Sequence, residues 1–224
     1  MQKKMSFFLC KVIAITVLAV PSAVWGQAEP TTANDFLQRG FGYYEQGDID
    51  RAIADFTQAI RLNPNSYGAY LFRGNSYIIK GDYDRGIADL DQSIKLNPNE
   101  SQTYYARGTA YKNKKDYDRA IADLTKAIQL DPKSPAIENL EDAYYSRGKA
   151  YNDRKDYDRA IADFTQAIRL DPNHVGTYVN RGFSYYYKGD IDRAIADFEA
   201  ALRINPNDAD VRKMLEYVRQ QRGR

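Results

Sequence analysis

The chain has 224 residues, of which 43% are apolar and 28% charged, a balance typical of folded proteins and too apolar for a disordered one. With 32 Lys and Arg against 30 Asp and Glu, the formal net charge of +2 gives no strong overall field for nucleic acid or an anionic membrane. A single Cys and a single His exclude a disulfide framework and a zinc site of the usual kind. We therefore expect no metal, no cofactor and no nucleic-acid partner.

The first 26 residues differ in composition from the rest of the chain. Three lysines accompany an uncharged apolar run at residues 12–20, and Pro21 and small residues follow. This layout is typical of a secretory signal peptide, with cleavage expected after Gly26, or after Ala28 as the second choice. The run is shorter than the roughly 20 residues of a membrane-spanning helix. We expect an exported protein, periplasmic or secreted, with an N-terminal membrane anchor as the minor alternative.

The remaining sequence is repetitive. An Arg-Gly dipeptide recurs at steps of 34, 34, 40 and 34 residues, and a proline closes each repeat. The dipeptides are Arg39-Gly40, Arg73-Gly74, Arg107-Gly108, Arg147-Gly148 and Arg181-Gly182, and the prolines are Pro64, Pro98, Pro132, Pro172 and Pro206. A fixed period of this length is the signature of a protein built from stacked repeats.

Each repeat contains two segments with helical periodicity. In the first repeat, Phe36, Gly40 and Tyr43 share one face of a helix, and residues 49–60 form a second apolar stripe. Asp48 is a suitable N-cap for the second helix. Each repeat is therefore predicted to be a helix hairpin whose apolar face only a neighbouring hairpin can bury.

The pattern resembles the tetratricopeptide repeat (TPR). The matching residues of the first repeat are Phe36, Gly40, Tyr43, Ala52, Phe56, Ala59 and Pro64, and the other four repeats match at the same positions, except that Gly86 and Ser93 replace Ala. The resemblance implies an all-α, right-handed α-solenoid of five TPR helix hairpins. After Pro206, we expect a capping helix with Val211, Leu215 and Val218 on its apolar side, because a solenoid needs a polar-backed terminal element.

These observations predict the domain boundaries. The expected segments are a signal peptide at 1–26, an N-terminal tail at 27–32, repeats at 33–66, 67–100, 101–134, 141–174 and 175–208, an insert at 135–140, and a capping helix and tail at 209–224. Ser134 and Pro135 suit a helix start, so the insert is expected to lengthen the following helix. It is either a lip beside the groove or a tolerated extension.

The repeated Gly and Arg residues are predicted to have structural roles. A mid-helix Gly costs about 1 kcal/mol relative to Ala, which we expect close helix contact to offset, with Gly40 opposite Ala52. Gly86 adds a second Gly to such a contact, so we expect the second repeat to be the least stable. An Asp follows each repeated Arg by sixteen residues, as Asp55 follows Arg39, which predicts Arg–Asp pairs. The alternative is a row of arginines that bind phosphate or carboxylate.

The resemblance also implies that the first helices line a concave groove and that their non-core side chains meet a ligand. This predicted peptide groove consists of Leu37, Gln38, Phe41, Tyr44, Leu71, Phe72, Asn75, Ile78, Tyr105, Thr109, Lys112, Tyr145, Lys149, Asn152, Val179, Asn180, Phe183 and Tyr186. The alternative for Leu37, Leu71, Tyr105, Tyr145 and Val179 is packing against the next repeat. The lysine–asparagine clamp of co-chaperone members is absent, because those five residues occupy the position that requires Lys.

No catalytic motif stands out. The sequence has no phosphate loop, no Gly-x-Ser-x-Gly and no His-Glu-x-x-His pattern, and His174 follows a turn where we expect a solvated loop residue. We predict that the protein is not an enzyme. The leading hypothesis is an interaction scaffold that binds a peptide or helical segment of another protein. The alternative is a structural protein that forms homo-oligomers by stacking end to end.

Overall fold

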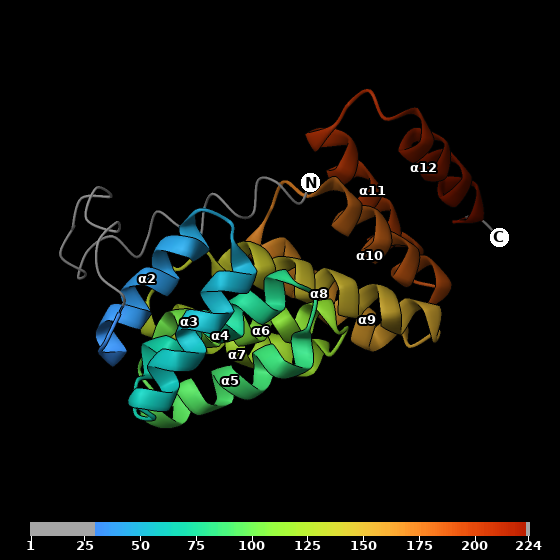
Figure 1. The fold of residues 1–224 in the computed structure, drawn as a ribbon. Helices are drawn as coiled ribbons and strands as arrows, with labels where there is room; N and C mark the ends of the chain where they lie inside the picture. The colour runs from blue at the N-terminus through green and yellow to red at the C-terminus, as the bar shows by residue number, and fades with distance from the viewer. Residues whose placement is uncertain (1–29, 223–224) are drawn as a thin grey trace. The chain divides into compact units, whose positions relative to one another are not determined.

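The computed structural model describes residues 30–222, so the predicted signal peptide lies outside the described residues. Within this range the chain is all-α, as predicted, with eleven helices and no strand (Figure 1). The helices are α2 (Ala33–Glu45), α3 (Ile49–Leu62), α4 (Tyr67–Ile79), α5 (Tyr83–Leu96), α6 (Ser101–Asn113), α7 (Tyr117–Leu130), α8 (Ala136–Asp153), α9 (Tyr157–Leu170), α10 (Val175–Tyr187), α11 (Ile191–Ile204) and α12 (Ala209–Gln221).

The helices form five hairpins in two compact units. The N-terminal unit ends at Pro98 and contains the hairpins α2–α3 and α4–α5. The C-terminal unit begins at Asn99 and contains the hairpins α6–α7, α8–α9 and α10–α11, followed by α12. Within each unit, the second helix of one hairpin packs against the first helix of the next. This succession of contacts is the predicted solenoid arrangement.

An aspartate begins every second helix. The Asp48 carboxylate accepts a hydrogen bond from the backbone N–H of Arg51 at 3.2 Å, as expected for an N-cap. A bond from the Arg51 guanidinium, together with the backbone bond, lowers the pKa of Asp48. The residue before this N-cap has positive φ in all five hairpins. It is Gly in three hairpins, but Lys115 and Lys155, at φ 61° and 60°, occupy the position in the third and fourth.

The glycine of each first helix lies against the second helix of its own hairpin. A Cβ added to Gly148 would lie 2.7 Å from Cε1 of Phe164, and one added to Gly74 would lie 3.0 Å from the carbonyl oxygen of Gly86. The predicted close approach is therefore confirmed. Phe164 is fully buried at this contact, so each missing side chain makes room for a core residue.

The repeated arginines bind the aspartates of their own hairpins. Arg39 Nε donates to Asp55 Oδ2 at 2.7 Å and its second nitrogen donates to Oδ1 at 2.9 Å, which is a bidentate pair. The same pair joins each of Arg73, Arg107, Arg147 and Arg181 to Asp89, Asp123, Asp163 and Asp197. Hydrogen bonding to Asp89 is the main cause that raises the pKa of Arg73. The prediction of Arg–Asp pairs is confirmed, and the arginines do not form a free ligand-binding row.

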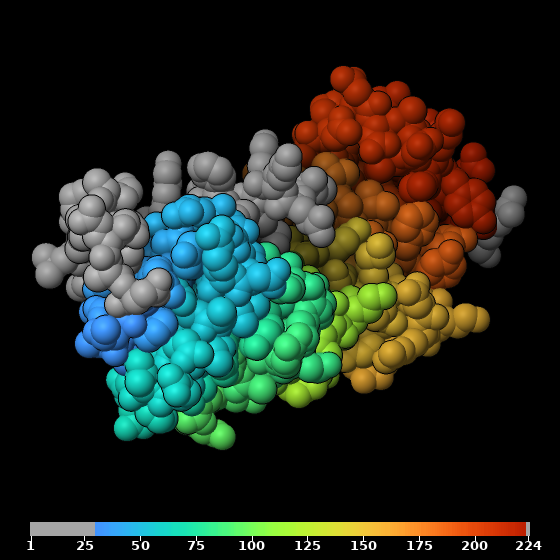
Figure 2. Space-filling model, viewed as in Figure 1, coloured from blue at the N-terminus to red at the C-terminus, as the bar shows by residue number. Residues whose placement is uncertain are grey.

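The predicted capping helix is α12. Its N-cap Asp208 accepts from the backbone N–H of Val211 at 3.1 Å. Val211, Leu215 and Val218 are buried against α11, around Phe198. In Figure 2 the red C-terminal residues form one continuous mass of atoms. The opposite side of α12 carries exposed charged residues, including Arg212 and Lys213.

Helix α8 contains 18 residues, whereas the other first helices contain 13. It begins one residue later than expected: Pro135 is its N-cap residue, and Ser134 Oγ accepts from the backbone N–H of Ala136 at 3.3 Å. The added N-terminal turn buries Ala136 and Leu140. The insert is therefore packed into the C-terminal unit.

Candidate first-helix binding surface

In the N-terminal unit, the predicted groove residues take part in hairpin packing. Phe72 lies 5.2 Å from Phe41 and 5.8 Å from Phe56 between ring centroids, so it joins the two hairpins. Leu71 and Asn75 are only 3% and 8% exposed. Tyr44 is also buried, whereas Leu37, Gln38 and Ile78 are half-buried. Only the accessible edges of these side chains remain for a ligand.

In the C-terminal unit, polar groove residues of α6 bind the beginning of α8. Lys112 Nζ donates to Asn139 Oδ1 and to Asp142 Oδ2, both at 2.7 Å. Asn139 Nδ2 donates in turn to the Tyr105 hydroxyl at 3.1 Å and to Thr109 Oγ1 at 3.3 Å. Burial is the main cause that raises the pKa of Tyr105. Three predicted groove residues therefore form one network with two residues that we did not predict.

A similar network joins α8 to α10. Asn180 Nδ2 donates to the Tyr145 hydroxyl at 3.2 Å, and Ser184 Oγ donates to Asn152 Oδ1 at 2.8 Å. Lys149 Nζ lies 5.6 Å from the centre of the Tyr145 ring, and Lys149 is the one exposed residue of the predicted groove. We name the two networks together the first-helix strip. Its members are Tyr105, Thr109, Lys112, Asn139, Asp142, Tyr145, Lys149, Asn152, Asn180 and Ser184.

Sequence reasoning missed Asn139, Asp142 and Ser184. The signal for Asn139 was its distance from Tyr105, which at 34 residues equals the ordinary repeat step. We assigned residues 135–140 to an insert and so did not consider them as groove positions. Ser184 was assigned no role, although its hydroxyl bonds both Asn152 and the carbonyl oxygen of Asn180.

The remaining groove residues lie at the C-terminal end of the unit. Phe183 meets Phe198 edge to face at 5.3 Å between ring centroids, and Val179 packs against the same core cluster. Tyr186 shares a hydrogen bond with Tyr217, the main cause of the raised pKa of Tyr186. These three groove residues are half-buried. The chain therefore presents partly accessible aromatic edges here, rather than free rings.

His174 differs from the expectation of a solvated loop residue. Its Nδ1 lies 2.8 Å from Glu141 Oε1 and 3.0 Å from Thr177 Oγ1, and its ring centroid lies 4.9 Å from that of Tyr145. Glu141 belongs to α8, so this half-buried histidine connects the start of α10 to the preceding hairpin. Sequence proximity to a turn could not reveal a partner 33 residues away.

Two features are absent from residues 30–222. No three side chains of the His, Cys, Asp or Glu type converge there as a metal ion would require. In the same range, no helix combines the length and apolar character needed to cross a bilayer.

Comparison with known families gives a consistent answer. Three family models, each described as tetratricopeptide repeat, match residues 37–101, 101–134 and 148–219. The chain belongs to the tetratricopeptide repeat family. In this TPR protein, α2, α4, α6, α8 and α10 are the first helices of the five repeats, and the first-helix strip joins three of them. No curated protein matches the chain.

Solved structures with the same fold include MamA and YrrB. A crystal structure of MamA is 26% identical, with a TM-score of 0.60, and the match covers 80% of this chain and 94% of MamA. A second MamA structure is 27% identical, with a TM-score of 0.57, and the match covers 76% of this chain and 96% of that one. YrrB, described as a TPR protein with an unusual peptide-binding site, is 21% identical, with a TM-score of 0.60 and coverage of 82% and 92%. The YrrB match shows the fold alone.

Proposed function

We propose that this TPR protein is a non-enzymatic interaction scaffold that binds a peptide or helical segment of another protein along its first helices. The observation that carries the proposal is the first-helix strip, in which hydrogen-bonded side chains continue from α6 across α8 to α10. TPR proteins generally serve as interaction modules rather than enzymes, and the family assignment supports the same function.

The strip suits recognition because its polar groups are already held in place. Tyr105 and Tyr145 each offer a hydroxyl whose position is set by an asparagine of the next first helix. A ligand that binds here need not pay the full entropy of ordering these side chains. With neighbouring helices about 9 to 10 Å apart, three first helices present a surface roughly 20 Å long, enough for about six extended residues.

The proposal includes export of the protein from the cytoplasm. The leader at residues 1–26 combines a basic start, a short apolar run and small residues at the expected cleavage site. We place the mature protein in the periplasm or outside the cell. Cleavage after Gly26 removes the only Trp of the chain, so the processed protein has tyrosine as its dominant fluorophore.

A paired substitution tests the binding surface. Asn152→Ala with Asn180→Ala removes side-chain bonds within the strip, while Ser184 Oγ keeps a bond to the Asn180 carbonyl oxygen. The matched control is Asn173→Ala with Asn207→Ala, two exposed asparagines in turns. Proximity labelling in the native envelope should identify proteins marked by the wild type and the control but several-fold less by the strip variant. Equal labelling by all three proteins contradicts binding along the strip.

A further inference from the structure

Ion pairs mark a shared register at two of the junctions between successive hairpins. The residue that follows α4, and the residue that follows α10, is a lysine that binds an aspartate in the first turn of the preceding second helix. Lys80 pairs with Asp50 in the N-terminal unit, and Lys188 pairs with Asp158 in the C-terminal unit. Both pairs span 30 residues.

The fourth hairpin departs from this register against the third. Arg154 follows α8 at the position of Lys80 and Lys188, yet Asp118 binds Arg147 instead, at 2.5 Å. Arg147 precedes Arg154 by seven residues, which is two helical turns or about 10 Å. The fourth hairpin is therefore displaced along the third by two turns.

Two further comparisons between hairpins give the same displacement. In the fifth hairpin, Arg181 donates to Thr165 Oγ1 at 3.1 Å. The matching threonine of the third hairpin is Thr125, and the Asp118 that Arg147 binds lies seven residues before it. Likewise, Asn180 of α10 binds Tyr145 of the preceding first helix. The residue of α8 that matches Asn180 in the repeat is Ser146, but Asn139, seven residues earlier, is the one that binds Tyr105. The Arg147–Asp118 pair and the Asn139–Tyr105 bond are independent contacts, and both report the same shift.

The shift leaves the end of α8 projecting beyond the tip of the third hairpin. Ser76 and Ser184, which hold the position equivalent to Ala150 in other hairpins, are fully buried, but Ala150 is partly exposed. Lys149 beside it is exposed. The insert therefore exposes part of α8 that would otherwise be covered by the preceding hairpin.

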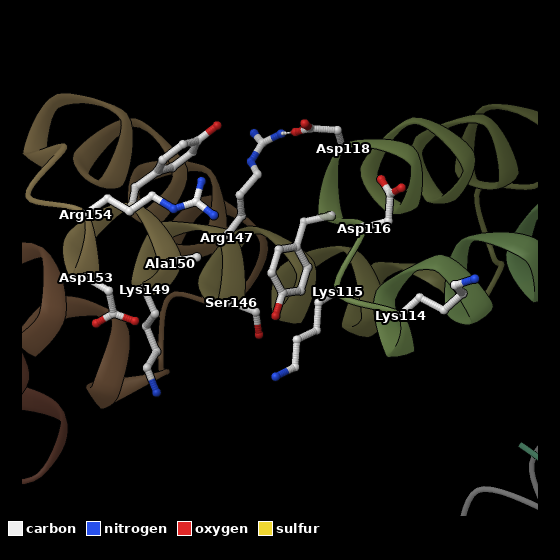
Figure 3. A pocket seen from close by; sticks show the side chains of 12 residues that line it. Lys114, Lys115, Asp116, Asp118, Ser146, Arg147, Lys149, Ala150, Asp153 and Arg154 are labelled. Carbon is white, nitrogen blue, oxygen red and sulfur yellow. Dashed lines mark hydrogen bonds and ion pairs between the residues drawn. The ribbon is translucent and has the colours of Figure 1, made fainter.

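An open cleft of about 760 Å³ lies where the end of α8 projects beyond the third hairpin. Residues 114–118, from the turn between α6 and α7 and the start of α7, form one side. The last two turns of α8, from Ser146, and Arg154 directly after the helix form the other side. Figure 3 shows Lys115, Ser146 and Lys149 projecting toward the same side of the cleft. The volume lies within the range of about 300 to 1,000 Å³ that is usual for ligand sites.

The cleft has an excess of positive charge. Asp116 is paired with Arg119, and Asp118 shares Arg147 with Asp163. Among residues 30–222, Lys115, Lys149 and Arg154 have no ion-pair partner, and Asp153 is the one lining carboxylate without one. The lining of the cleft therefore carries three cations and one anion that have no ion-pair partner.

We propose that this cleft binds the carboxylates of an acidic segment in the partner protein. The inference rests on the proposed function, because the occupant is part of the bound protein. A single exposed ion pair contributes little, so a segment that meets Lys115, Lys149 and Arg154 together binds more tightly than a single small anion. Lys149 also belongs to the first-helix strip, so a segment bound along the strip reaches the cleft.

The test uses the full mature chain and two defined peptides. Fluorescence anisotropy at low ionic strength measures the binding of a labelled ten-residue peptide of alternating Glu and Gly, and of the same peptide with Gln for Glu. The Glu peptide should bind at least tenfold more tightly. Lys115→Glu with Arg154→Glu should remove that preference, while Lys133→Glu with Arg203→Glu, which changes the net charge equally at exposed sites, should keep it. Circular dichroism checks that both variants are folded.

Three results would overturn the proposal. The first is equal binding of the two peptides by the wild type, and the second is an equal loss of the preference for the Glu peptide in the control variant. The third is displacement of the labelled Glu peptide by inorganic phosphate at the same molar concentration as the unlabelled peptide, which would indicate a site for free anions. The labelling experiment separates this inference from the proposed function. Labelling lost in the strip variant but unchanged by Lys115→Glu with Arg154→Glu refutes only the acidic-segment site, whereas labelling unchanged by either variant refutes binding along the first helices.

Discussion

Replacing Gly148 with Ala should destabilise the protein even though Ala is the better helix former. The new Cβ would lie 2.7, 2.9 and 3.1 Å from three atoms of the Phe164 ring. Carbon atoms pack favourably at about 3.5 to 4.0 Å, so the fully buried ring must move. Overpacking of this kind costs about 1 to 3 kcal/mol, against a gain of about 1 kcal/mol in helix propensity. We expect a net loss of about 1 kcal/mol.

Two other glycines provide matched comparisons. At Gly182 the new Cβ would lie 3.2 Å from the nearest atoms of Phe198, so a shift of a few tenths of an ångström accommodates it and we expect little net change. At Gly42, inside α2, no atom lies within 4 Å of the added Cβ. That substitution should stabilise the fold by about 1 kcal/mol through helix propensity alone.

Urea unfolding of the three variants measures these differences. The expected order of stability is Gly42→Ala above wild type, Gly182→Ala near wild type and Gly148→Ala below it. Because a repeat protein can unfold in stages, hydrogen exchange in α8 and α9 should locate the loss in the fourth hairpin. The same effect at Gly42 and Gly148 would refute the idea that close helix contact is the reason for these glycines.

Four further predictions follow from other contacts. Lys155→Gly should raise stability by about 1 kcal/mol in urea unfolding, because Lys155 has a φ of 60°, where glycine is unstrained; a loss would mean that its side chain is needed. The urea midpoint should fall below about pH 4. Bonds from Arg51 and Arg85 lower the pKa of Asp48 and Asp82 in the folded state. The two carboxylates therefore stabilise the fold fully above their unfolded pKa, and this stabilisation is lost as the pH falls through their folded pKa. Asp48→Asn should weaken that dependence. Hydrogen exchange should be fastest in the second hairpin, where Gly74 faces Gly86, and uniform protection would contradict this. Protein purified from the cell envelope should lack tryptophan emission and sediment as a monomer; a tryptophan band indicates a retained leader, and association with rising concentration supports end-to-end stacking.

The groove residues Phe41 and Phe183 show what the repeat pattern could not decide. The pattern placed both aromatic rings in the predicted peptide groove, where a ligand could contact them. In the structure, both rings pack on other aromatic side chains, Phe72 and Phe198, so a charge there would test stability rather than binding. Periodicity assigns a residue to a helix face, but it does not distinguish a surface that meets a ligand from one that meets the next hairpin.

The Arg–Asp pairs were predictable for a different reason. Both partners belong to the same hairpin, and the short turn brings positions sixteen residues apart to the same height. The capping aspartates were predictable in the same way, because each bonds a backbone N–H three residues along the chain. These contacts depend on local geometry, which repeats whenever the residues repeat.

The amino-acid sequence by itself determined the hairpins, their caps and the pairs within them, since these form between residues held close by a helix or a short turn. Only the tertiary structure decided how the fourth hairpin sits on the third. Asn139 and Ser146 lie on the same side of α8, two turns apart, so periodicity permits either one opposite Tyr105. The observed register places Asn139 there, buries Leu140 and lets Asp142 bind Lys112. Packing between distant segments made that choice, and it opened the cleft beside Arg154.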